Sequence, residues 1–355
     1  MTEYFASSQL DQLSAAEPVE RLITQYLLER VPEFRDLSEL RRKGWDNPKG
    51  DTFFKNQRQN ADNPDKKTSE WFFRMMKQIA EELHISTDAF SINPPYGRKP
   101  RILDLCMAPG GYLYTALQKV PGAEALAFSL PTSNGGHQVL LRQTQGVECR
   151  FLDVTMLAAD MGTDTIPASH PESDGFIERQ LQAREKFDLV LCDGQVLRTH
   201  IRPEYRESQE AVRLHTAQLV LGLEHLEPLG TMVVLLHKLE AYRTVSVIRR
   251  FSTFSNVKLF KPSKSHCTRS SFYMVATHVQ SQHDNAIRAI AEWKTMWNMT
   301  TFGTKEDYLR HAENAKKEEY VQFENFGPEL VRLGRDIWRI QRDALARAPF
   351  IRNTH

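Results

Sequence analysis

A turn of small residues between an apolar run and an expected helix could hold a ligand. The apolar run covers residues 101–105, the turn covers residues 108–111 (Ala-Pro-Gly-Gly), and the helix is expected over residues 112–119. Glycines between a strand and a helix let the backbone approach a ligand at the helix N-terminus. The sequence of this turn lacks the GxGxxG spacing of dinucleotide-binding turns, which disfavours a dinucleotide as the ligand.

Polar residues also stand at the ends of the apolar runs that follow. Ser129 lies near the end of the second run, Asp153 follows the third, Asp193 follows the fourth, and Lys238 comes shortly after the fifth. Ligands of open α/β sheets bind beyond the carboxyl ends of the strands, so we expect these side chains near one site. Carboxylates accept hydrogen bonds from hydroxyl and amino groups, and a neutral lysine amine can take up a proton.

The same residues carry a resemblance to a known family. Residues 104–112 (Asp-Leu-Cys-Met-Ala-Pro-Gly-Gly-Tyr) resemble motif I of the FtsJ-like ribose 2′-O-methyltransferases, and residues 187–194 resemble motif IV. Residues 152–154 (Leu-Asp-Val) resemble the family's Gly-Asp-Ile/Val, and residues 261–276 resemble its KPxxSR…SxExYxVA segment. The resemblance covers about residues 70–278 and implies a class I methyltransferase that binds S-adenosyl-L-methionine (SAM).

The resemblance also implies a role for each matching residue. Asp153 would meet the adenine amino group, and Ser129 stands where the family often has an acid for the cofactor ribose. The implied cofactor-binding residues are Asp104, Cys106, Pro109, Gly110, Gly111, Tyr112, Ser129, Leu130, Asp153, Val154 and Asp193. The family's catalytic tetrad is Lys-Asp-Lys-Glu, and this chain has Arg74, Asp193, Lys238 and Ser271 at those positions.

Two tetrad positions therefore differ from the family, and three functions remain open. Arg74 can supply charge but cannot act as a base, so Lys77, one helical turn on, is an alternative. Glu240, two residues beyond Lys238, could partly replace the carboxylate absent at Ser271. The chain could methylate RNA at ribose 2′-hydroxyls, methylate a small molecule or protein, or bind SAM as an inactive scaffold.

The elements that position these residues are short apolar runs separated by longer segments. Long connections between the first five runs indicate parallel strands, and the short loop between the last two predicts an antiparallel hairpin. We therefore predict an α/β, Rossmann-like class I methyltransferase fold with a mainly parallel seven-stranded sheet and a terminal hairpin. The strands are expected over residues 101–105, 125–130, 148–152, 187–192, 230–236, 257–260 and 272–277.

Helical extensions are expected on both sides of this sheet. We predict an N-terminal extension over residues 1–68, the methyltransferase domain over residues 69–280 and a C-terminal extension over residues 281–355. A loop is expected over residues 44–68 and an inserted loop with a short helix over residues 161–185. Helices are expected over residues 18–30, 69–84 (burying Trp71), 285–298, 304–319 and 327–347, with Pro328 in the first turn of the last. The apolar stripes of the terminal helices would pack on their own core or bind a protein partner.

Composition and charge limit the possible binding partners of the protein and its cellular compartment. The net charge of the 355 residues is only +1, but seven Lys and Arg residues lie between Glu240 and Ser271, a basic strip that would contact RNA phosphates or face solvent. The four cysteines are scattered and lack the spacing of metal ligands, so we expect free thiols and no metal. No apolar run approaches the roughly 18 residues of a membrane span, and the first residues lack the features of a secretory signal. We therefore expect an intracellular protein, cytoplasmic or nuclear.

Overall fold

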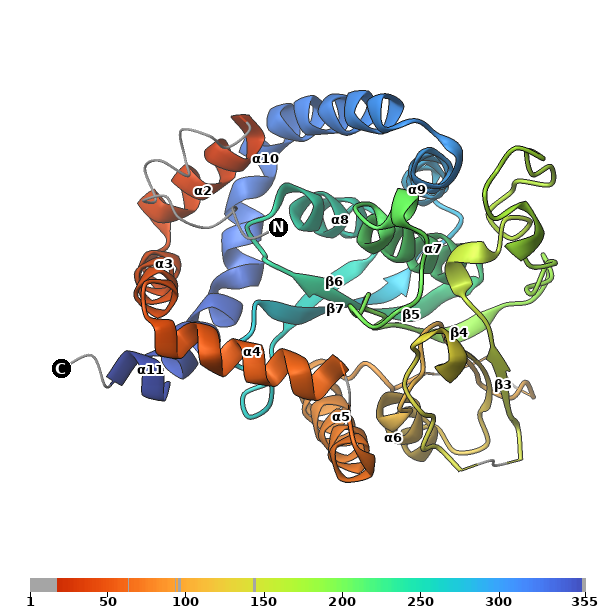
Figure 1. Cartoon of the computed structure of the whole chain (residues 1–355), viewed down its shortest axis with the longest axis horizontal. Helices are drawn as coiled ribbons and strands as arrows, with labels where there is room; N and C mark the ends of the chain where they lie inside the picture. The colour runs from red at the N-terminus through yellow and green to blue at the C-terminus, as the bar shows by residue number, and fades with distance from the viewer. Residues whose placement is uncertain (1–17, 63, 93, 95–96, 143–144, 353–355) are drawn as a thin grey trace.

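A mixed seven-stranded sheet forms the centre of the molecule (Figure 1). The computed structural model describes residues 18–62, 64–92, 94, 97–142 and 145–352. The strand order is β3-β2-β1-β4-β5-β7-β6, with β1 to β5 parallel and β7 antiparallel to both β5 and β6. The predicted fold class and terminal hairpin are confirmed. The strands are β1 (Arg101–Asp104), β2 (Glu124–Ser129), β3 (Val147–Phe151), β4 (Phe187–Cys192), β5 (Leu226–His237), β6 (Asn256–Phe260) and β7 (Ser271–Val279).

Helices cover both faces of this sheet. Ile102 of β1 packs among apolar side chains of α5 and α6, whereas Leu103 packs in the core that α7, α8 and α9 share. Because both faces are buried, the central strands are continuous apolar runs rather than alternating ones. The covering helices are α5 (Lys66–Thr87), α6 (Gly111–Lys119), α7 (Glu210–Glu224), α8 (Tyr242–Ser252) and α9 (Asp284–Phe302).

The helices from the two ends of the sequence pack together beside α8 and β6 (Figure 1). We call this group the terminal lobe; it consists of α2 (Pro18–Arg30), α3 (Pro32–Trp45), α4 (Pro48–Asp62), α10 (Lys305–Ala346) and α11 (Pro349–Arg352). Ring contacts join its two halves, with centroids 5.6 Å apart for Phe34 and Trp338 and 5.3 Å apart for Tyr26 and Phe323. The apolar stripe of α10 is therefore buried within the chain itself. The domain boundaries at residues 68 and 280 stay predictions.

The prediction of a loop over residues 44–68 is wrong, because α4 occupies most of this segment. Phe53 and Phe54 both pack on Phe350, with ring centroids 5.1 and 5.5 Å away. A Cβ on Gly50 would lie 2.2 Å from the carbonyl oxygen of Gly44, so α4 also approaches the end of α3 closely. These contacts bring together residues distant in sequence, and they stabilise a helix whose polar composition alone favours a loop.

One helix, α10 (Lys305–Ala346), replaces the two helices predicted over residues 304–319 and 327–347. Pro328 lies inside it, where proline removes one backbone hydrogen bond and favours a bend. Figure 1 shows the helix turning from a segment across the top of the view to one that runs down its left side. Buried Phe326 and Leu330 stand on either side of the proline, so packing continues through it and keeps the helix intact.

Other expectations have simpler outcomes. The inserted segment 161–185 is a loop whose helical part is the single turn η3 (Ser173–Gly175). Within the described ranges, none of the helices has the length and hydrophobicity to span a membrane, and no cluster of His, Cys, Asp or Glu side chains is arranged to hold a metal ion. The cysteines are free thiols. The expectation about a secretory signal rests on residues that lie outside the described ranges.

Candidate functional site

A cavity of about 220 Å³ lies at the carboxyl ends of β1, β2, β3 and β4. We call it the strand-end cavity. Each of these strands ends in a turn that contributes to its wall, as expected for an open α/β sheet. Seven of the eleven predicted cofactor-binding residues line it: Cys106, Pro109, Ser129, Leu130, Asp153, Val154 and Asp193.

The other four predicted cofactor residues shape the turn and are absent from the described lining. Gly110 has φ 101°, and a Cβ at Gly111 would lie 2.5 Å from the carbonyl oxygen of Phe73 in α5. These positions require glycine because the turn is left-handed and α6 packs tightly on α5. Asp104 is buried, and its Oδ1 accepts a hydrogen bond of 3.2 Å from the Cys106 amide. Tyr112 is buried against Tyr273, with ring centroids 5.3 Å apart.

Two carboxyl groups, Asp104 and Asp193, interact at the ends of the adjacent strands β1 and β4. Burial raises the pKa of Asp193 to about 7. Burial also raises the pKa of Asp104 well above its usual range, the negative charge of Asp193 raises it further, and the Cys106 amide opposes both effects. Near neutral pH the pair therefore retains protons that exposed aspartates would have lost, and a cationic ligand would favour their ionised forms.

Buried charged side chains surround Asp153 at another part of the cavity wall. Asp153 Oδ1 accepts hydrogen bonds from the amide and hydroxyl of Thr155, at 2.9 and 2.7 Å, so it caps the turn that follows β3. Arg206, only 4% exposed, places Nη2 3.6 Å from Asp153 Oδ2 and Nε 3.7 Å from Glu210 Oε2. Sequence reasoning assigned no role to Arg206 or Glu210. Charged residues between β4 and α7 resemble ordinary surface residues until the fold buries them.

The family model of the FtsJ-like methyltransferases matches residues 79–279, which is more than half of the chain. The chain belongs to the FtsJ-like methyltransferase family. The match thus covers the whole sheet and the last part of α5, residues 79–87, whereas the cavity-lining residues Phe72, Met75 and Met76 of α5 precede it. The terminal lobe lies outside the match, and no curated protein matches the chain.

Several solved methyltransferase structures are similar to this chain at low identity. Human Methyltransferase-like protein 13 in complex with SAH is 13% identical, with 62% of this chain and 92% of that chain covered and a TM-score of 0.35. An O-methyltransferase family protein from Burkholderia thailandensis is 12% identical, with 79% of each chain covered and a TM-score of 0.34. TrmN from Thermus thermophilus is 13% identical, with 57% and 48% covered and a TM-score of 0.31. These values are too low to assign a substrate.

The four tetrad positions of the FtsJ-like domain do not converge on the cavity. Of the four, Asp193 alone is among the described residues of the lining. Lys238 is exposed directly after β5, with a positive φ of 47°. Arg74 is exposed on α5, whose cavity-facing side chains are instead Phe72, Met75 and Met76. Ser271 is buried at the start of β7, opposite His237 of β5.

Lys77 and Glu240, the alternatives considered for the altered tetrad positions, also make contacts away from the cavity. Lys77 Nζ lies 3.9 Å from the centre of the Tyr114 ring, a cation–π contact on the outer side of α6. Glu240 accepts a hydrogen bond of 2.8 Å from Arg41 of α3. Both side chains are thus engaged in contacts with helices, and the two residues are absent from the described lining of the cavity.

Three aromatic side chains, Trp71, Phe72 and His137, form a group at the cavity. Trp71 of α5 is 50% exposed, which contradicts the prediction that this helix buries it. Its ring centroid is 5.2 Å from that of Phe72, which in turn is 6.4 Å from that of His137. Phe72 and His137 line the cavity. We call Trp71, Phe72 and His137 the aromatic ledge.

The basic strip between Glu240 and Ser271 does not form a continuous exposed surface. Arg249 of α8 pairs with Glu319 of α10 at 2.9 Å, and Arg250 pairs with Glu292 of α9. Lys261 is 2% exposed, and burial lowers its pKa to about 7. α8 packs against α9 and α10, so the arginines at its end meet acids of those helices. Of the strip, Arg269 alone is among the described residues that line the strand-end cavity.

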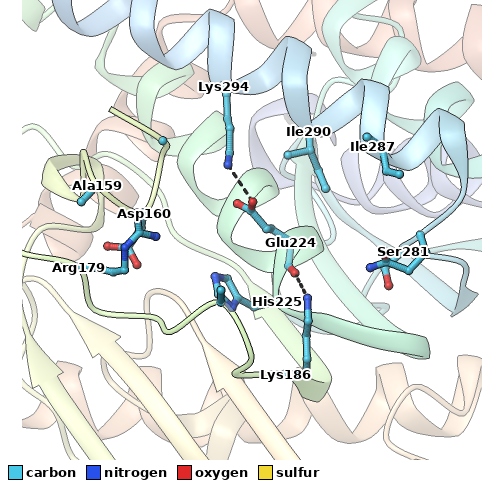
Figure 2. A pocket seen from close by; sticks show the side chains of 13 residues that line it. Ala159, Asp160, Arg179, Lys186, Glu224, His225, Ser281, Ile287, Ile290 and Lys294 are labelled. Carbon is cyan, nitrogen blue, oxygen red and sulfur yellow. Dashed lines mark hydrogen bonds and ion pairs between the residues drawn. The ribbon is translucent and has the colours of Figure 1, made fainter. Parts of the chain in front are cut away.

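A second cavity, of about 460 Å³, lies at the opposite end of the strands, near the start of β4 and β5 (Figure 2). Figure 2 shows Lys186 and Lys294 pointing toward Glu224 at the end of α7. Lys294 Nζ is 2.8 Å from Glu224 Oε1, and Lys186 donates to the Glu224 carbonyl oxygen. These lysines satisfy the C-terminal end of α7, an ordinary structural role. The chemistry is therefore expected at the strand-end cavity.

Lys261 has its own structural role in the loop that carries Arg269. Its Nζ donates hydrogen bonds to the carbonyl oxygens of Arg269 at 2.7 Å, Ser271 at 2.8 Å and His266 at 3.4 Å. His266 and Arg269 both line the cavity. The buried lysine therefore fixes the loop that presents these two side chains and is not itself available to a ligand.

Proposed function

We propose that the protein binds SAM in the strand-end cavity and transfers its methyl group to ribose 2′-hydroxyls of RNA. The observation that carries this proposal is the combination of a methyltransferase strand-end cavity with an aromatic ledge and arginines in one place. Phe72, His137, Arg202 and Arg269 all line the cavity, and Trp71 extends the ledge to the surface.

The residues of the cavity fit SAM. Ser129 is buried, and its Oγ has no hydrogen-bond partner within the described part of the chain, so it can bind a ribose hydroxyl of the cofactor. By the family resemblance, Asp153 would accept a hydrogen bond from the adenine amino group, and Arg206 Nη2, 3.6 Å from Asp153 Oδ2, would help to hold this carboxylate. The raised pKa of Asp193 marks a carboxyl group that gains from a cationic neighbour.

The chemistry assigned to the chain's own residues is positioning and proton uptake. Bound in the cavity, SAM would supply an electrophilic methyl group, whose transfer breaks a sulfur–carbon bond, forms an oxygen–carbon bond and releases the hydroxyl proton. Lys238 follows β5, which pairs with β4, and Asp193 directly follows β4. We assign proton uptake to Lys238, and Asp193, in the cavity wall, would lie beside the bound cofactor.

The aromatic ledge suggests an unpaired nucleotide as the acceptor. Stacking of a base on an aromatic side chain contributes about 1–3 kcal/mol and requires little sequence specificity. Trp71→Ala is therefore expected to weaken the binding of a single-stranded oligoribonucleotide by about 5- to 150-fold. Tyr320→Ala is the matched control, because Tyr320 is 46% exposed on α10, an element that contributes no described residue to the cavity. Equal affinities of the two variants would remove the ledge from RNA recognition.

The decisive experiment is methyl transfer from SAM labelled in its methyl group to total RNA, compared with RNase-treated extract. Digestion of the product to nucleosides should place the label on 2′-O-methyl ribose. Lys238→Ala is expected to retain SAM binding by calorimetry and to lose transfer. Label that survives RNase treatment, or that is found on a base, would exclude ribose methylation.

A SAM-binding protein without transfer activity is the second candidate. It is favoured by the positions of Arg74, which is exposed, and Ser271, which is buried, since neither is among the described cavity residues. SAM binding without transfer to any RNA or protein pool would select it. The idea that the terminal helices roof the cavity of a small-molecule methyltransferase is not supported, because the terminal lobe contributes no described residue to the lining.

A further inference from the structure

Two loops beside the strand-end cavity carry residues of the proposed reaction. The β5–α8 loop, residues 238–241, begins with Lys238. The β6–β7 loop, residues 261–270, carries His266 and Arg269, which line the cavity. The amide of Lys238 donates a hydrogen bond of 3.1 Å to the carbonyl oxygen of Ser270, so the two loops also contact each other. Their positions relative to the cavity are therefore coupled.

One guanidinium group of the terminal lobe binds the β5–α8 loop directly and the β6–β7 loop through Gln341. Arg41 Nη1 donates to Glu240 Oε1 at 2.8 Å, and Arg41 Nη2 donates to Gln341 Oε1 at 2.8 Å. Gln341 Nε2 then donates to the carbonyl oxygen of Thr268 at 3.2 Å. The Glu240 side chain is 17% exposed and Gln341 is 4% exposed, so these hydrogen bonds are largely shielded from solvent. We call Arg41, Glu240, Gln341 and the Thr268 carbonyl the lobe anchor.

Close packing of the β5–α8 loop against α10 reinforces the lobe anchor. Leu239, between Lys238 and Glu240, is fully buried against α10. A Cβ on Gly334 would lie 2.5 Å from Leu239 Cδ2, so the helix can approach this closely only at a glycine. Lys238 itself has φ 47°, in the left-handed region that residues other than glycine rarely adopt. Such a conformation persists where the surrounding structure holds it.

We propose that the terminal lobe is a positioning device for the methyl-transfer site and that Arg41 is its central positioning residue. This inference rests on the proposed function, since it gives Lys238 and the β6–β7 loop their roles. Arg41 keeps the β5–α8 loop and the β6–β7 loop fixed relative to each other, with Lys238 in its left-handed conformation. Gln57 of α4 adds a weaker contact, because Arg269 Nε donates to its Oε1 at 3.4 Å.

The test compares Arg41→Met with Arg342→Met. Arg342 of α10 pairs with Asp36 of α3 at 3.4 Å, so the control removes an ion pair inside the terminal lobe that touches neither loop. Amide hydrogen exchange in Arg41→Met is expected to rise about tenfold in residues 238–241 and 262–270 and to stay unchanged in residues 101–112. The Arg342→Met variant should exchange like the wild type in both loops.

Activity measurements separate positioning from folding. SAM affinity should stay within about twofold in Arg41→Met, because the cofactor residues lie on β1 to β4, whereas the turnover number should fall about 10- to 100-fold. Arg41→Lys, which can replace only one of the two hydrogen bonds, should restore part of the turnover. A wild-type protein that transfers no methyl group to RNA would refute the proposed function, and the exchange experiment would still decide the anchor.

Amide hydrogen exchange of Arg41→Met that equals the wild type in both loops, or that rises uniformly along the chain, would refute the role of the lobe anchor. If Arg41→Met does not fold, Gln341→Leu and Glu240→Gln dissect the same contacts separately. Gln341→Leu should loosen residues 262–270 more than residues 238–241, and Glu240→Gln should do the reverse. Equal effects of these two variants on both loops would refute the assignment.

Discussion

The substitution Asp193→Asn tests the electrostatics of the strand-end cavity without any knowledge of the substrate. Asp193 lies at the cavity wall, and burial raises its pKa from an ordinary 3.8 to about 7. A carboxyl group with a raised pKa in the folded protein binds its proton more tightly there than in the unfolded chain. Its stabilising contribution is therefore complete below pH 4 and is lost as the pH rises through 7.

The magnitude follows from the size of this shift. About 3 pH units at about 1.36 kcal/mol each give an upper limit of about 4 kcal/mol lost between pH 4 and pH 7 in the ligand-free protein. Asparagine has nearly the same shape and stays neutral. Asp193→Asn should therefore match the wild type in unfolding free energy near pH 4 and exceed it above pH 7 by up to this amount.

Urea denaturation of the SAM-free proteins at pH 5, 6, 7 and 8 measures the difference. Asp188→Asn is the control, because Asp188 is also buried but accepts hydrogen bonds from Arg98 and, at 2.8 Å, from the Arg101 amide. That variant should be less stable than the wild type at pH 8. A constant difference between Asp193→Asn and the wild type from pH 5 to pH 8 would refute the reasoning.

Three further predictions concern the cofactor and the loops. SAM affinity of the wild type should increase by up to about tenfold in total between pH 6 and pH 8 and level off above pH 7, because ionised Asp193 favours a cation. Calorimetry should show a weaker dependence for SAH, which lacks the sulfonium charge, and none for Asp193→Asn. Gly111→Val should lower the unfolding free energy by about 1–3 kcal/mol or more and abolish SAM binding, because its Cβ would overlap α5. An unchanged midpoint of urea unfolding would contradict the close packing of α6 on α5. Lys261→Met should cost about 1–3 kcal/mol in thermal or urea unfolding, since buried carbonyl oxygens lose their donor, and unaltered stability would show that these hydrogen bonds are dispensable.

The sheet and the turn at residues 108–111 were predictable because the residue patterns that specify them lie close together in the sequence. Apolar runs separated by long or short connections specify parallel and antiparallel pairing, and the structure has the predicted parallel strands and antiparallel hairpin. The turn at Gly110 and Gly111 demands glycine for reasons of backbone conformation and close packing, and both can be inferred from a strand–turn–helix context.

The features that escaped prediction depend on contacts between distant parts of the chain. α4 is stabilised by Phe350, nearly at the other end of the sequence. The exposure of Trp71 depends on what covers α5, which a helical stripe cannot specify. Arg206 and Lys261 are charged residues whose burial arises only when α7 and the β6–β7 loop take their places. The catalytic roles of Arg74, Lys238 and Ser271 stay predictions, because they depend on side-chain directions that family motifs do not contain.

The terminal lobe has a consequence for the order in which the protein matures during synthesis. Arg41 and Gln341 are 300 residues apart in the sequence, and Asn47 donates a hydrogen bond to the carbonyl oxygen of Phe350. α3 and α4 leave the ribosome early, but their packing partners in α10 and α11 emerge only after the entire sheet has been made. The sheet and the turn at residues 108–111 can therefore form first. Until α10 has been synthesised, α3 and α4 expose apolar faces that a chaperone could bind.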